Sequence, residues 1–443
     1  PKAHYKHKQR SIRRDLPAKS VQACFHSAKF FELTKKECRT EIVRHYLNSR
    51  VSMGNGRNGQ KNSGGGGGNR AEDFDFCAIT APLTAWFSAN KRDLPWRENP
   101  TPYRVWVSEI MLQQTRVEAA RDYYLRFLNA LPAVEDLAAC NEETLMKLWE
   151  GLGYYSRARN LHKTAKIVCE EYGGEFPCDE KLLRALPGIG DYTVGAIRSI
   201  AFGLPAPAVD GNVLRVCARL SADGTEISDE NFKARLKALL APAYPETPRG
   251  CSDFTQALME LGALVCTPRS PACGGCPLSA MCIAHARGAE DEYPVLPEKK
   301  PKREQNIYAF VILTSRGISF RKRNKGVLRG LNEFPSEIVD FGDDPGGLNG
   351  ANRVAGGSDG GTDENARALR ILKEQGVSGA KILGKHRYAH IFTHVKWTVT
   401  AFTVTAESAP FEAASAEELR ETVAFPTAFR RCLDYLGDFE RGE

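Results

Sequence analysis

The stretch Leu186-Pro187-Gly188-Ile189-Gly190, followed by Asp191-Tyr192-Thr193-Val194-Gly195-Ala196, decides the fold of the central part of the chain. Helical patterns lie on both sides of it, and Pro187 ends the first helix. Gly188 and Gly190 permit a tight hairpin and let the backbone come close to a partner. The unpaired N–H groups that open the second helix form a phosphate site. The residues expected at a DNA backbone are Gly188, Ile189, Gly190 and Thr193.

Two helices joined in this way form a helix-hairpin-helix motif, and the surrounding sequence agrees with it. From about residue 74 to residue 286 the apolar residues recur with helical spacing, and strand-like alternation is scarce. We therefore predict an all-α domain over 71–286. Its expected helices lie within 102–127, 145–149, 158–172, 181–186, 194–202, 213–220, 231–240 and 254–265.

The flanking regions have a different composition. Residues 1–70 are basic and then Gly/Asn-rich, which argues against order; a targeting or DNA-tethering arm and an ordinary tail are equally open. Residues 287–304 are acidic, then rich in Pro and Lys, and are expected to be a linker. An α+β domain is predicted over 305–443, with a disordered loop at 342–361. Its expected elements are strands at 307–313, 317–322 and 396–405 and helices at 364–375 and 425–436.

The composition restricts the class of protein. The formal net charge of +7 suits a polyanionic partner, although a mildly basic surface is common in proteins without one. No apolar run is long enough to cross a bilayer, and no secretory signal opens the chain. The 13 cysteines are an odd number, and a chain of 443 residues does not need disulfides to fold. We therefore expect reduced thiols, a metal site and an intracellular protein.

Four cysteines stand apart from the others because they fall within a short segment. Cys266, Cys273, Cys276 and Cys282 follow the spacing C-x6-C-x2-C-x5-C. Thiolate ligands suit structural zinc or a [4Fe–4S] cluster. Zinc sites usually contain two short C-x2-C pairs, and only one is present. The spacing resembles that of the endonuclease III-like glycosylases, in which it holds [4Fe–4S]; one such cluster is the expected cofactor.

Asp210 opens a helix in Val209-Asp210-Gly211-Asn212-Val213. Taken alone, an N-cap is the simpler interpretation, because Asp caps helices well. At this distance after a helix-hairpin-helix motif, Asp210 resembles the catalytic aspartate of that glycosylase superfamily. Tyr192 stands where bifunctional members carry a lysine nucleophile, so Schiff-base chemistry and a strong lyase step are not expected.

Three further motifs narrow the substrate that the resemblance implies. They are Arg92-Asp93-Leu94-Pro95-Trp96-Arg97, the run Val107-Ser108-Glu109-Ile110-Met111-Leu112-Gln113-Gln114-Thr115, and Gly151-Leu152-Gly153-Tyr154-Tyr155-Ser156-Arg157-Ala158-Arg159. Together they resemble the adenine DNA glycosylases (MutY-type), which remove adenine mispaired with 8-oxoguanine. The resemblance covers roughly residues 73–282.

The resemblance implies a general acid at Glu109, which would protonate adenine N7 and make the base a good leaving group. Burial in an apolar pocket would raise the pKa of Glu109 far enough for this role, whereas an exposed helix acid is the plainer alternative. Asp210 would stay ionised and stabilise the oxocarbenium-like sugar. The result would be monofunctional hydrolysis of the N-glycosidic bond.

The same resemblance assigns roles around these two carboxylates. Tyr192 and Asn212 would support the catalytic water and the carboxylate, and Gln256 would contact the adenine edge. Gln114 and Tyr154 would wedge into the duplex as the nucleotide leaves the stack, although Tyr154 could equally fill a core. The residues expected to line the pocket are Arg92, Leu94, Trp96 and Arg97.

The C-terminal domain resembles the Nudix-like domain of the same family. Gly330-Leu331-Asn332-Glu333-Phe334-Pro335 has Asn332 where the family usually has Trp. Phe392-Thr393-His394, followed by Trp397, matches the loop that contacts the 8-oxoguanine strand, with Thr393 in place of Ser. Arg370 and Lys373 stand where a Nudix hydrolase needs acids for Mg²⁺, so we expect a recognition module and not a phosphohydrolase.

The expected partner is double-stranded DNA that contains A:8-oxoguanine or A:G mispairs, bound by a monomer. The linker 287–304 is a candidate docking segment for repair proteins, and no membrane partner is expected. The nucleus is the expected compartment, with the mitochondrion as the alternative. Two other functions remain open at this point: a glycosylase for oxidised pyrimidines, and a DNA-binding protein without activity that uses the cluster for structure.

Overall fold

The computed structural model describes residues 74–298, 301–339 and 360–435, which divide into two compact units. The first contains residues 74–139 and 160–298, and the second contains residues 140–159 together with the described residues after 300. The predicted arm, 1–70, lies outside the described residues, as does the predicted loop 342–361 up to the start of a helix at residue 360.

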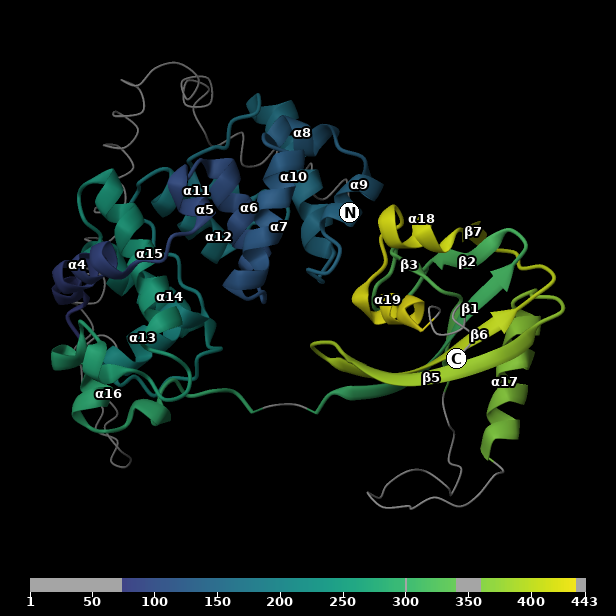
Figure 1. Ribbon diagram of the computed structural model, residues 1–443. Helices are drawn as coiled ribbons and strands as arrows, with labels where there is room; N and C mark the ends of the chain where they lie inside the picture. Colours follow the sequence, from purple (N-terminus) through teal and green to yellow (C-terminus); the bar gives the residue numbers. More distant parts are fainter. Residues whose placement is uncertain (1–73, 299–300, 340–359, 436–443) are drawn as a thin grey trace, which may run out of the picture. The chain divides into compact units, whose positions relative to one another are not determined.

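The first unit is helical, as predicted (Figure 1). Its α-helices are α4 (Thr80–Asn90), α5 (Pro95–Glu98), α6 (Pro102–Leu112), α7 (Val117–Ala130), α8 (Val134–Ala139), α10 (Ser156–Tyr172, whose first turn belongs to the second unit), α11 (Glu180–Arg184), α12 (Asp191–Ala196), α13 (Gly211–Ser221), α14 (Glu230–Leu240), α15 (Pro248–Leu264) and α16 (Ile283–Ala286). A π-helical turn, η4 (Ile197–Ala201), continues α12. Short 3₁₀ turns are η3 (Phe76–Ile79), η5 (Ala241–Ala243), η6 (Cys273–Gly275), η7 (Ser279–Met281) and η8 (Glu290–Glu292).

Two helices differ from the prediction for local reasons. The single run expected over 102–127 is two helices, because the chain leaves the helix at Gln113 and takes a left-handed conformation at Gln114, with φ of 59°. Helix α15 begins at Pro248 and not at residue 254. Thr247 caps it by accepting a hydrogen bond from the Gly250 N–H, and Pro248 fits the first helical position.

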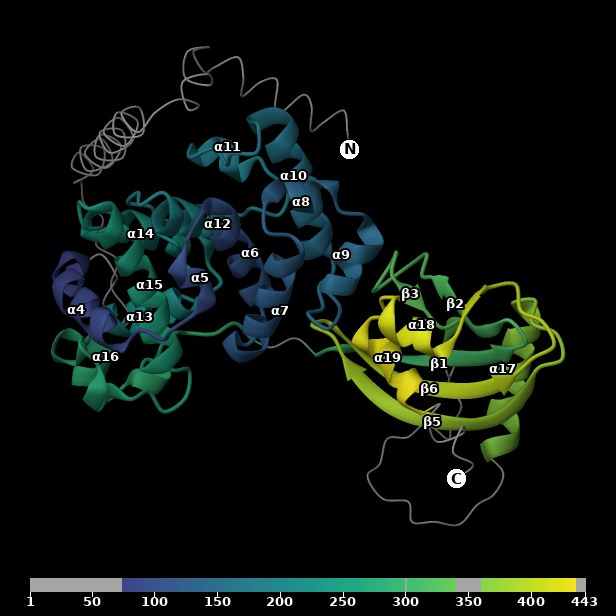
Figure 2. The same cartoon turned by 45° about the horizontal axis from the view of Figure 1, so that its top comes forward.

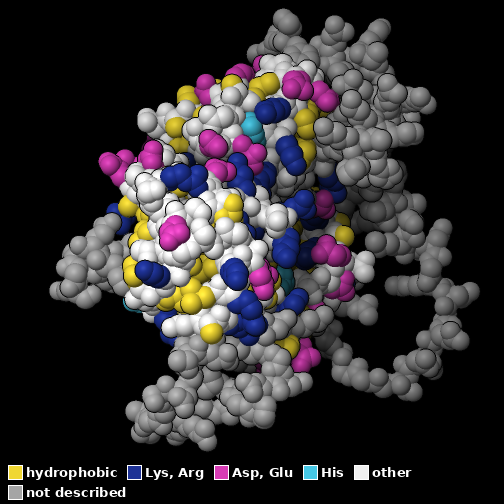
Figure 3. Space-filling model, turned by 90° about the vertical axis from the view of Figure 1, so that its right-hand side faces the viewer, with side chains coloured by type: hydrophobic (Ala, Val, Ile, Leu, Met, Phe, Trp, Pro, Cys, Tyr) yellow, Lys and Arg dark blue, Asp and Glu magenta, His cyan; other side chains and the backbone are white. Residues whose placement is uncertain are grey.

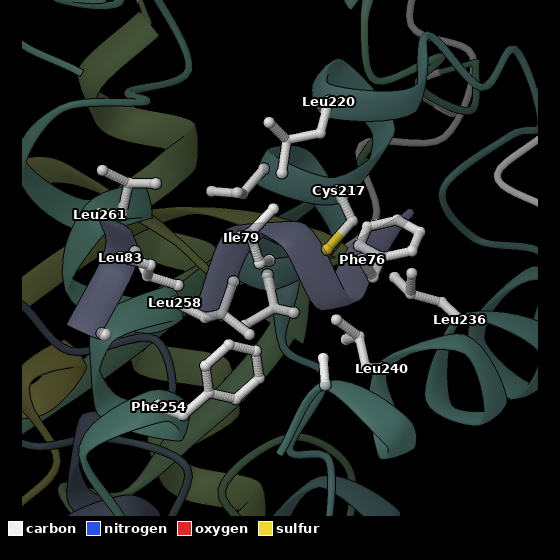
Figure 4. Packing of buried hydrophobic residues seen from close by; sticks show 14 of the residues in the cluster. Phe76, Ile79, Leu83, Cys217, Leu220, Leu236, Leu240, Phe254, Leu258 and Leu261 are labelled. Carbon is white, nitrogen blue, oxygen red and sulfur yellow. The ribbon is translucent and has the colours of Figure 1, made fainter. Parts of the chain in front are cut away.

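The core of the first unit lies where α15 crosses α4 and α13 (Figure 4). Phe254, Leu258 and Leu261 on one face of α15 meet Ile79 and Leu83. The fully buried Cys217 of α13 lies in the same cluster and is a free thiol. Burial of these side chains fixes the direction of α15, and therefore of the polar residues on its other faces.

A glycine makes a second contact of α15 unusually close. A Cβ placed on Gly262 would lie 2.7 Å from the Cβ of Asn212, closer than real Cβ contacts. Without a side chain at residue 262, α15 packs directly on the first turn of α13, next to Asp210. This close approach holds the first turn of α13 against α15.

The second unit contains a mixed sheet with the strand order β3-β2-β1-β6-β5, with β4 paired to β1 and β7 to β2. Its strands are β1 (Arg303–Thr314), β2 (Gly317–Lys322), β3 (Asn332–Glu333), β4 (Ser336–Val339), β5 (Lys381–Ile391), β6 (Val395–Thr405) and β7 (Glu412–Ala414). β1 and β6 are parallel, whereas β5 and β6 form an antiparallel hairpin. Its helices are α9 (Glu142–Leu148), α17 (Gly360–Glu374), α18 (Ala416–Glu421) and α19 (Thr427–Asp434).

Helices cover both faces of this sheet (Figures 1 and 2). Ala368 and Leu372 of α17 pack on one face with Phe310 and Phe402. Phe429 of α19 packs on the other face, in a cluster that also holds Leu419 of α18. The predicted α+β architecture is therefore confirmed, with α17 and α19 close to the helices expected at 364–375 and 425–436.

Residues 140–159 group with the second unit through polar contacts. The Lys147 Nζ donates to the carbonyl of Arg420 at 2.8 Å. Glu150 accepts from the Phe425 N–H at 3.1 Å and pairs with Arg430 at 2.7 Å. These contacts hold α9 beside α18 and α19, although the sequence predicts α9 as part of a domain over 71–286.

The surface shows no large patch of one charge on the face drawn in Figure 3, where Lys and Arg side chains alternate with Asp and Glu. Glu364, for example, pairs with both Lys385 and Arg387. Within the described ranges, none of the helices has the length and apolar character needed to cross a membrane.

The core predicts the effect of a large-to-small substitution. Phe254→Ala should lower the free energy of unfolding of the first unit by about 3–5 kcal/mol, because it removes a fully buried ring and leaves a cavity. Urea denaturation followed by helical circular dichroism measures this change. Leu125→Ala, at a position that is 48% exposed on α7, is the control and should change it by less than about 0.5 kcal/mol. Equal losses for both variants would contradict the assignment of the core.

Candidate active site

A cavity of about 610 Å³ in the first unit collects most of the residues that the sequence predicts to be catalytic or to bind the substrate. Elements α5, α6, α12, α13 and α15 all contribute to its wall. The predicted residues that line it are Arg92, Leu94, Trp96, Arg97, Glu109, Gln114, Tyr192, Asp210, Asn212 and Gln256. Residues from distant parts of the sequence therefore meet in one site, with two carboxylates among them.

Glu109 lies on the buried face of α6 and is 6% exposed. Burial raises the pKa of Glu109 to about 7; the nearby Asp210 charge adds to this effect, while the hydrogen bond from the Tyr192 hydroxyl and the charge of Arg97 oppose it. The structure thus gives Glu109 the environment of a carboxylic acid that keeps its proton near neutral pH.

Asp210 caps α13, as the simpler interpretation predicts, and it also lines the cavity. Its carboxylate accepts from the Val213 N–H and from the Asn212 amide, each at 2.8 Å. Burial raises the pKa of Asp210, while these hydrogen bonds favour the ionised form. These two donors and the charge of Arg215 stabilise the Asp210 anion against the effect of burial.

Glu260 is a pocket residue that sequence reasoning missed. Its buried carboxylate accepts from Arg92 and Arg97 at 2.8 and 2.9 Å. Burial opposes ionisation of Glu260, but these hydrogen bonds outweigh it and bring its pKa to about 2. Arg97 also donates to the Gln256 Oε1 at 3.0 Å, which fixes the orientation of that amide. Gln256 and Glu260 are four residues apart on α15, a helical spacing that could have indicated a shared face.

Arg215 is a second missed residue. Its guanidinium donates to the Asn212 Oδ1 at 2.9 Å and to the carbonyls of Gly262 and Cys266 at 2.8 Å each. One side chain therefore connects the residue beside Asp210 with the first of the four clustered cysteines. A buried arginine on α13 gives no sequence signal that separates it from a surface charge.

The glycine hairpin of the segment Leu186–Gly190 lies between α11 and α12. Gly188 has a left-handed φ of 78°, which favours glycine, and Gly190 is the N-cap of α12. Both glycines are exposed, whereas Ile189 and Thr193 are 4% and 2% exposed. The glycine backbone is thus open to a partner, but the side chains of Ile189 and Thr193 serve packing.

The two predicted wedge residues share an unusual backbone conformation. Gln114 and Tyr154 have left-handed φ values of 59° and 46°, which residues other than glycine rarely adopt. The Tyr154 side chain is not core filler, since the residue is 45% exposed. Its hydroxyl is hydrogen-bonded to the Thr393 hydroxyl within the second unit.

Phe392, Thr393 and His394 form the turn between β5 and β6 in the second unit. Thr393 and His394 are exposed at the tip, while Phe392 is half-buried. The β5–β6 hairpin thus presents the tip of this turn to solvent.

Asn332 stands where the family usually has Trp. Its side chain donates a hydrogen bond to the Ala424 carbonyl at 3.1 Å.

The four clustered cysteines surround a small cavity of about 20 Å³. All four are free thiols, and Arg219 donates to the Cys266 Sγ at 3.3 Å. His285 and Glu290 come close to Cys273, with the ligand atoms of the three within 4.8 Å of one another. Four convergent sulfurs with a buried guanidinium beside them fit an iron–sulfur cluster, whose negative charge such a donor stabilises. Cys266, Cys273, Cys276 and Cys282 would hold it.

The pKa of Glu109 predicts a pH-dependent stability. In the unfolded chain this carboxyl ionises near pH 4.5, whereas in the folded protein it keeps its proton up to about pH 7. Its contribution to stability is therefore complete below pH 4.5 and is lost as the pH rises to about 7. Glu109→Gln should become more stable relative to the wild type as the pH rises, by up to about 3 kcal/mol.

Urea denaturation of both proteins at about pH 5 and about pH 8 measures this difference. Glu175→Gln, an exposed carboxylate of the first unit, controls for the loss of one charge. A stability difference between Glu109→Gln and the wild type that stays constant with pH would show that Glu109 is not buried as a neutral acid.

The cysteine cluster predicts the metal content. The purified chain should be brown and contain about four iron and four sulfide ions, and Cys276→Ser should lower both. Cys77→Ser, at an exposed thiol of η3, should leave the iron content unchanged. Elemental analysis distinguishes the outcomes, and stoichiometric zinc without iron would contradict the assignment.

Two family models match segments that lie mainly in the first unit. The model of the HhH-GPD superfamily of base excision DNA repair proteins matches residues 107–242. The iron-sulfur binding domain of endonuclease III matches residues 266–282, the segment bounded by the first and the last clustered cysteine. The structure of a thermostable thymine-DNA glycosylase covers 49% of this chain and 99% of its own, with 28% identity and a TM-score of 0.43.

Curated relatives are more informative about the family. The adenine DNA glycosylase of Rattus norvegicus is 44% identical over 236 residues, which are 50% of this chain and 45% of that protein. The adenine DNA glycosylase of Schizosaccharomyces pombe is 31% identical over 387 residues, which are 72% of this chain and 80% of that protein. The chain thus spans about half the length of the rat relative, but most of the length of the yeast relative. On this evidence, the chain belongs to the adenine DNA glycosylase family.

Proposed function

We propose that this protein removes adenine that is mispaired with 8-oxoguanine or guanine in duplex DNA, by hydrolysis of the N-glycosidic bond. The observation that carries the proposal is a pair of carboxylates in one cavity, the buried Glu109 and the half-buried Asp210, with different hydrogen-bond environments. Carboxylates with separated protonation states are the requirement of acid-assisted glycosidic cleavage.

Glu109 is the general acid in this proposal. A pKa of about 7 keeps a large fraction of the acid protonated at neutral pH, and the proton passes from its carboxyl to N7 of adenine. The C1′–N9 bond then breaks, and its electron pair leaves with the protonated base. Tyr192 holds the Glu109 carboxyl in place by its hydrogen bond.

Asp210 stabilises the positive charge that develops on the sugar. Its anion is held by Val213 and Asn212, so the carboxylate is oriented before the substrate arrives. A water molecule then attacks C1′, and its proton passes to solvent. Tyr192 cannot form a Schiff base with the sugar, so the reaction ends at an abasic site and leaves the strand intact.

The remaining pocket residues suit recognition of a purine. Arg97 and Gln256 are hydrogen-bonded to each other at the wall of the cavity, and Glu260 forms ion pairs with both Arg92 and Arg97. Leu94 and Trp96 are nearly buried and give the same wall an apolar surface. A flipped adenine would meet polar groups at its edge and apolar groups at its face. Phe392, Thr393 and His394 of the second unit would contact the base opposite.

An excision assay tests this function. Duplexes with adenine opposite 8-oxoguanine, guanine or thymine, and a duplex with thymine glycol, are treated with the protein and then with or without alkali. We expect strand breaks at adenine opposite 8-oxoguanine and guanine, and only after alkali. Glu109→Gln should lower the single-turnover rate at least about 100-fold while DNA binding is retained; Glu175→Gln is the control.

Three results would contradict the proposal. Cleavage only at thymine glycol would identify a glycosylase for oxidised pyrimidines. Strand breaks without alkali would identify a lyase step. An excision rate that Glu109→Gln leaves unchanged would show that this carboxyl takes no part in the reaction.

A further inference from the structure

The turn Phe392–His394 has a fixed base and an exposed tip. The Phe392 N–H donates to the Val395 carbonyl at 2.8 Å, and the Arg303 N–H donates to the His394 carbonyl at 3.0 Å. Lys302 donates from its side chain to the Phe392 carbonyl at 2.9 Å. The backbone of the turn is therefore held at both ends, and two side chains fix it further: Phe392, through its ring contacts, and Thr393, through its hydrogen bond with the Tyr154 hydroxyl.

Aromatic contacts hold the Phe392 side chain. The Phe392 ring lies edge-on to the His390 ring, with centroids 4.6 Å apart, and edge-on to the Trp397 ring, with centroids 4.7 Å apart. Edge-to-face pairs at this spacing have a preferred geometry and are not easily exchanged for other packing. The position of Phe392 therefore depends on the position of Trp397.

Trp397 is itself fixed on several sides. It is 1% exposed, and its indole N–H donates to the Gln305 Oε1 at 3.1 Å. The Phe429 ring packs against it at 5.9 Å, and the guanidinium carbon of Arg323 lies 5.1 Å from the indole ring. A cation at this distance from an indole is attracted to the ring, and more strongly where both are shielded from water.

A buried ion pair determines where the Arg323 guanidinium lies. Arg323 is 7% exposed and pairs with Glu333, which is 2% exposed; the Ser336 hydroxyl is hydrogen-bonded to both side chains. The Arg323 Nε donates to the Val327 carbonyl at 2.8 Å. Hydrogen bonds from Nε and Nη1 thus hold the guanidinium of Arg323 with its carbon over the indole ring of Trp397.

We propose that Arg323 is a positioning residue for recognition of the base opposite the adenine. It acts through Trp397 and Phe392 to set Thr393 and His394, and it touches no DNA itself. This inference rests on the proposed function, because the turn must contact the 8-oxoguanine strand for Arg323 to affect specificity. Arg323 therefore contributes to discrimination between 8-oxoguanine and guanine, and not to the excision step.

The chain offers a matched control in Arg321. Arg321 pairs with the same Glu333 at 3.0 Å and donates to the Ser336 carbonyl at 2.8 Å, but its guanidinium lies near Phe411 and not near Trp397. Arg323→Lys and Arg321→Lys each weaken one side of the Glu333 pair, and only the first removes the guanidinium that lies over Trp397. Trp397→Phe keeps an aromatic ring at that position, whereas Trp397→Leu does not.

Two measurements on the full chain test the proposal. Amide hydrogen exchange of residues 390–397 should be faster in Arg323→Lys than in Arg321→Lys at equal thermal stability. The ratio of single-turnover rates for adenine opposite 8-oxoguanine and opposite guanine should fall about tenfold in Arg323→Lys and Trp397→Leu, which corresponds to about 1.4 kcal/mol. Arg321→Lys and Trp397→Phe should keep the wild-type ratio, and all four variants should keep the rate opposite guanine.

The outcomes separate this proposal from the proposed function. Equal exchange and equal ratios in Arg323→Lys and Arg321→Lys would overturn the positioning role while leaving the glycosylase function in place. A fall in the rate opposite guanine to the same extent as that opposite 8-oxoguanine would also overturn it. A wild type with no preference for 8-oxoguanine would overturn both the opposite-base part of the proposed function and the specificity role of Arg323. If Arg323→Lys is unstable, the test uses Trp397→Leu and Trp397→Phe, which leave the ion pair intact. Equal ratios of the rates opposite 8-oxoguanine and guanine in these two variants would then overturn the positioning role.

Discussion

The first unit depends on the burial of one face of α15. Phe254, Leu258 and Leu261 lie in the core on that face, and Gly262 lets the helix pack directly against Asn212. The same rigid helix carries Gln256 and Glu260 into the cavity and leads directly to Cys266, the first clustered cysteine. Because one helix supplies residues of the core and the pocket and leads into the cysteine segment, displacement of its apolar face would disturb all three.

Three carboxylates in the same pocket show how neighbours decide protonation where burial alone does not. Burial favours the neutral form of each of them. Two guanidiniums overcome this effect at Glu260, and backbone and amide donors oppose it at Asp210. At Glu109 burial and the nearby Asp210 charge outweigh the Tyr192 hydrogen bond and raise its pKa to about 7. Identical chemical groups thus gain distinct properties from the elements that surround them.

The sequence predicted the helical unit, the α+β unit and the membership of the pocket because local patterns carry that information. Helical spacing, the glycine hairpin and the cysteine spacing are all set within short segments. Glu260, Arg215 and Arg323 were not predicted, because their importance comes from partners far away in the chain, such as Arg92, Cys266 and Trp397. The grouping of residues 140–159 with the second unit also depends on distant contacts, among them the Arg430–Glu150 pair.

The left-handed backbone at Gln114 and Tyr154 has a thermodynamic consequence of its own. Each such conformation costs about 1–3 kcal/mol outside glycine, and here the cost is met when the chain folds, in the absence of DNA. In the proposed role, in which both residues enter the duplex, a residue already in its bound conformation loses little further freedom when DNA arrives. Under that proposal the cost falls on the folding equilibrium and not on the affinity for DNA.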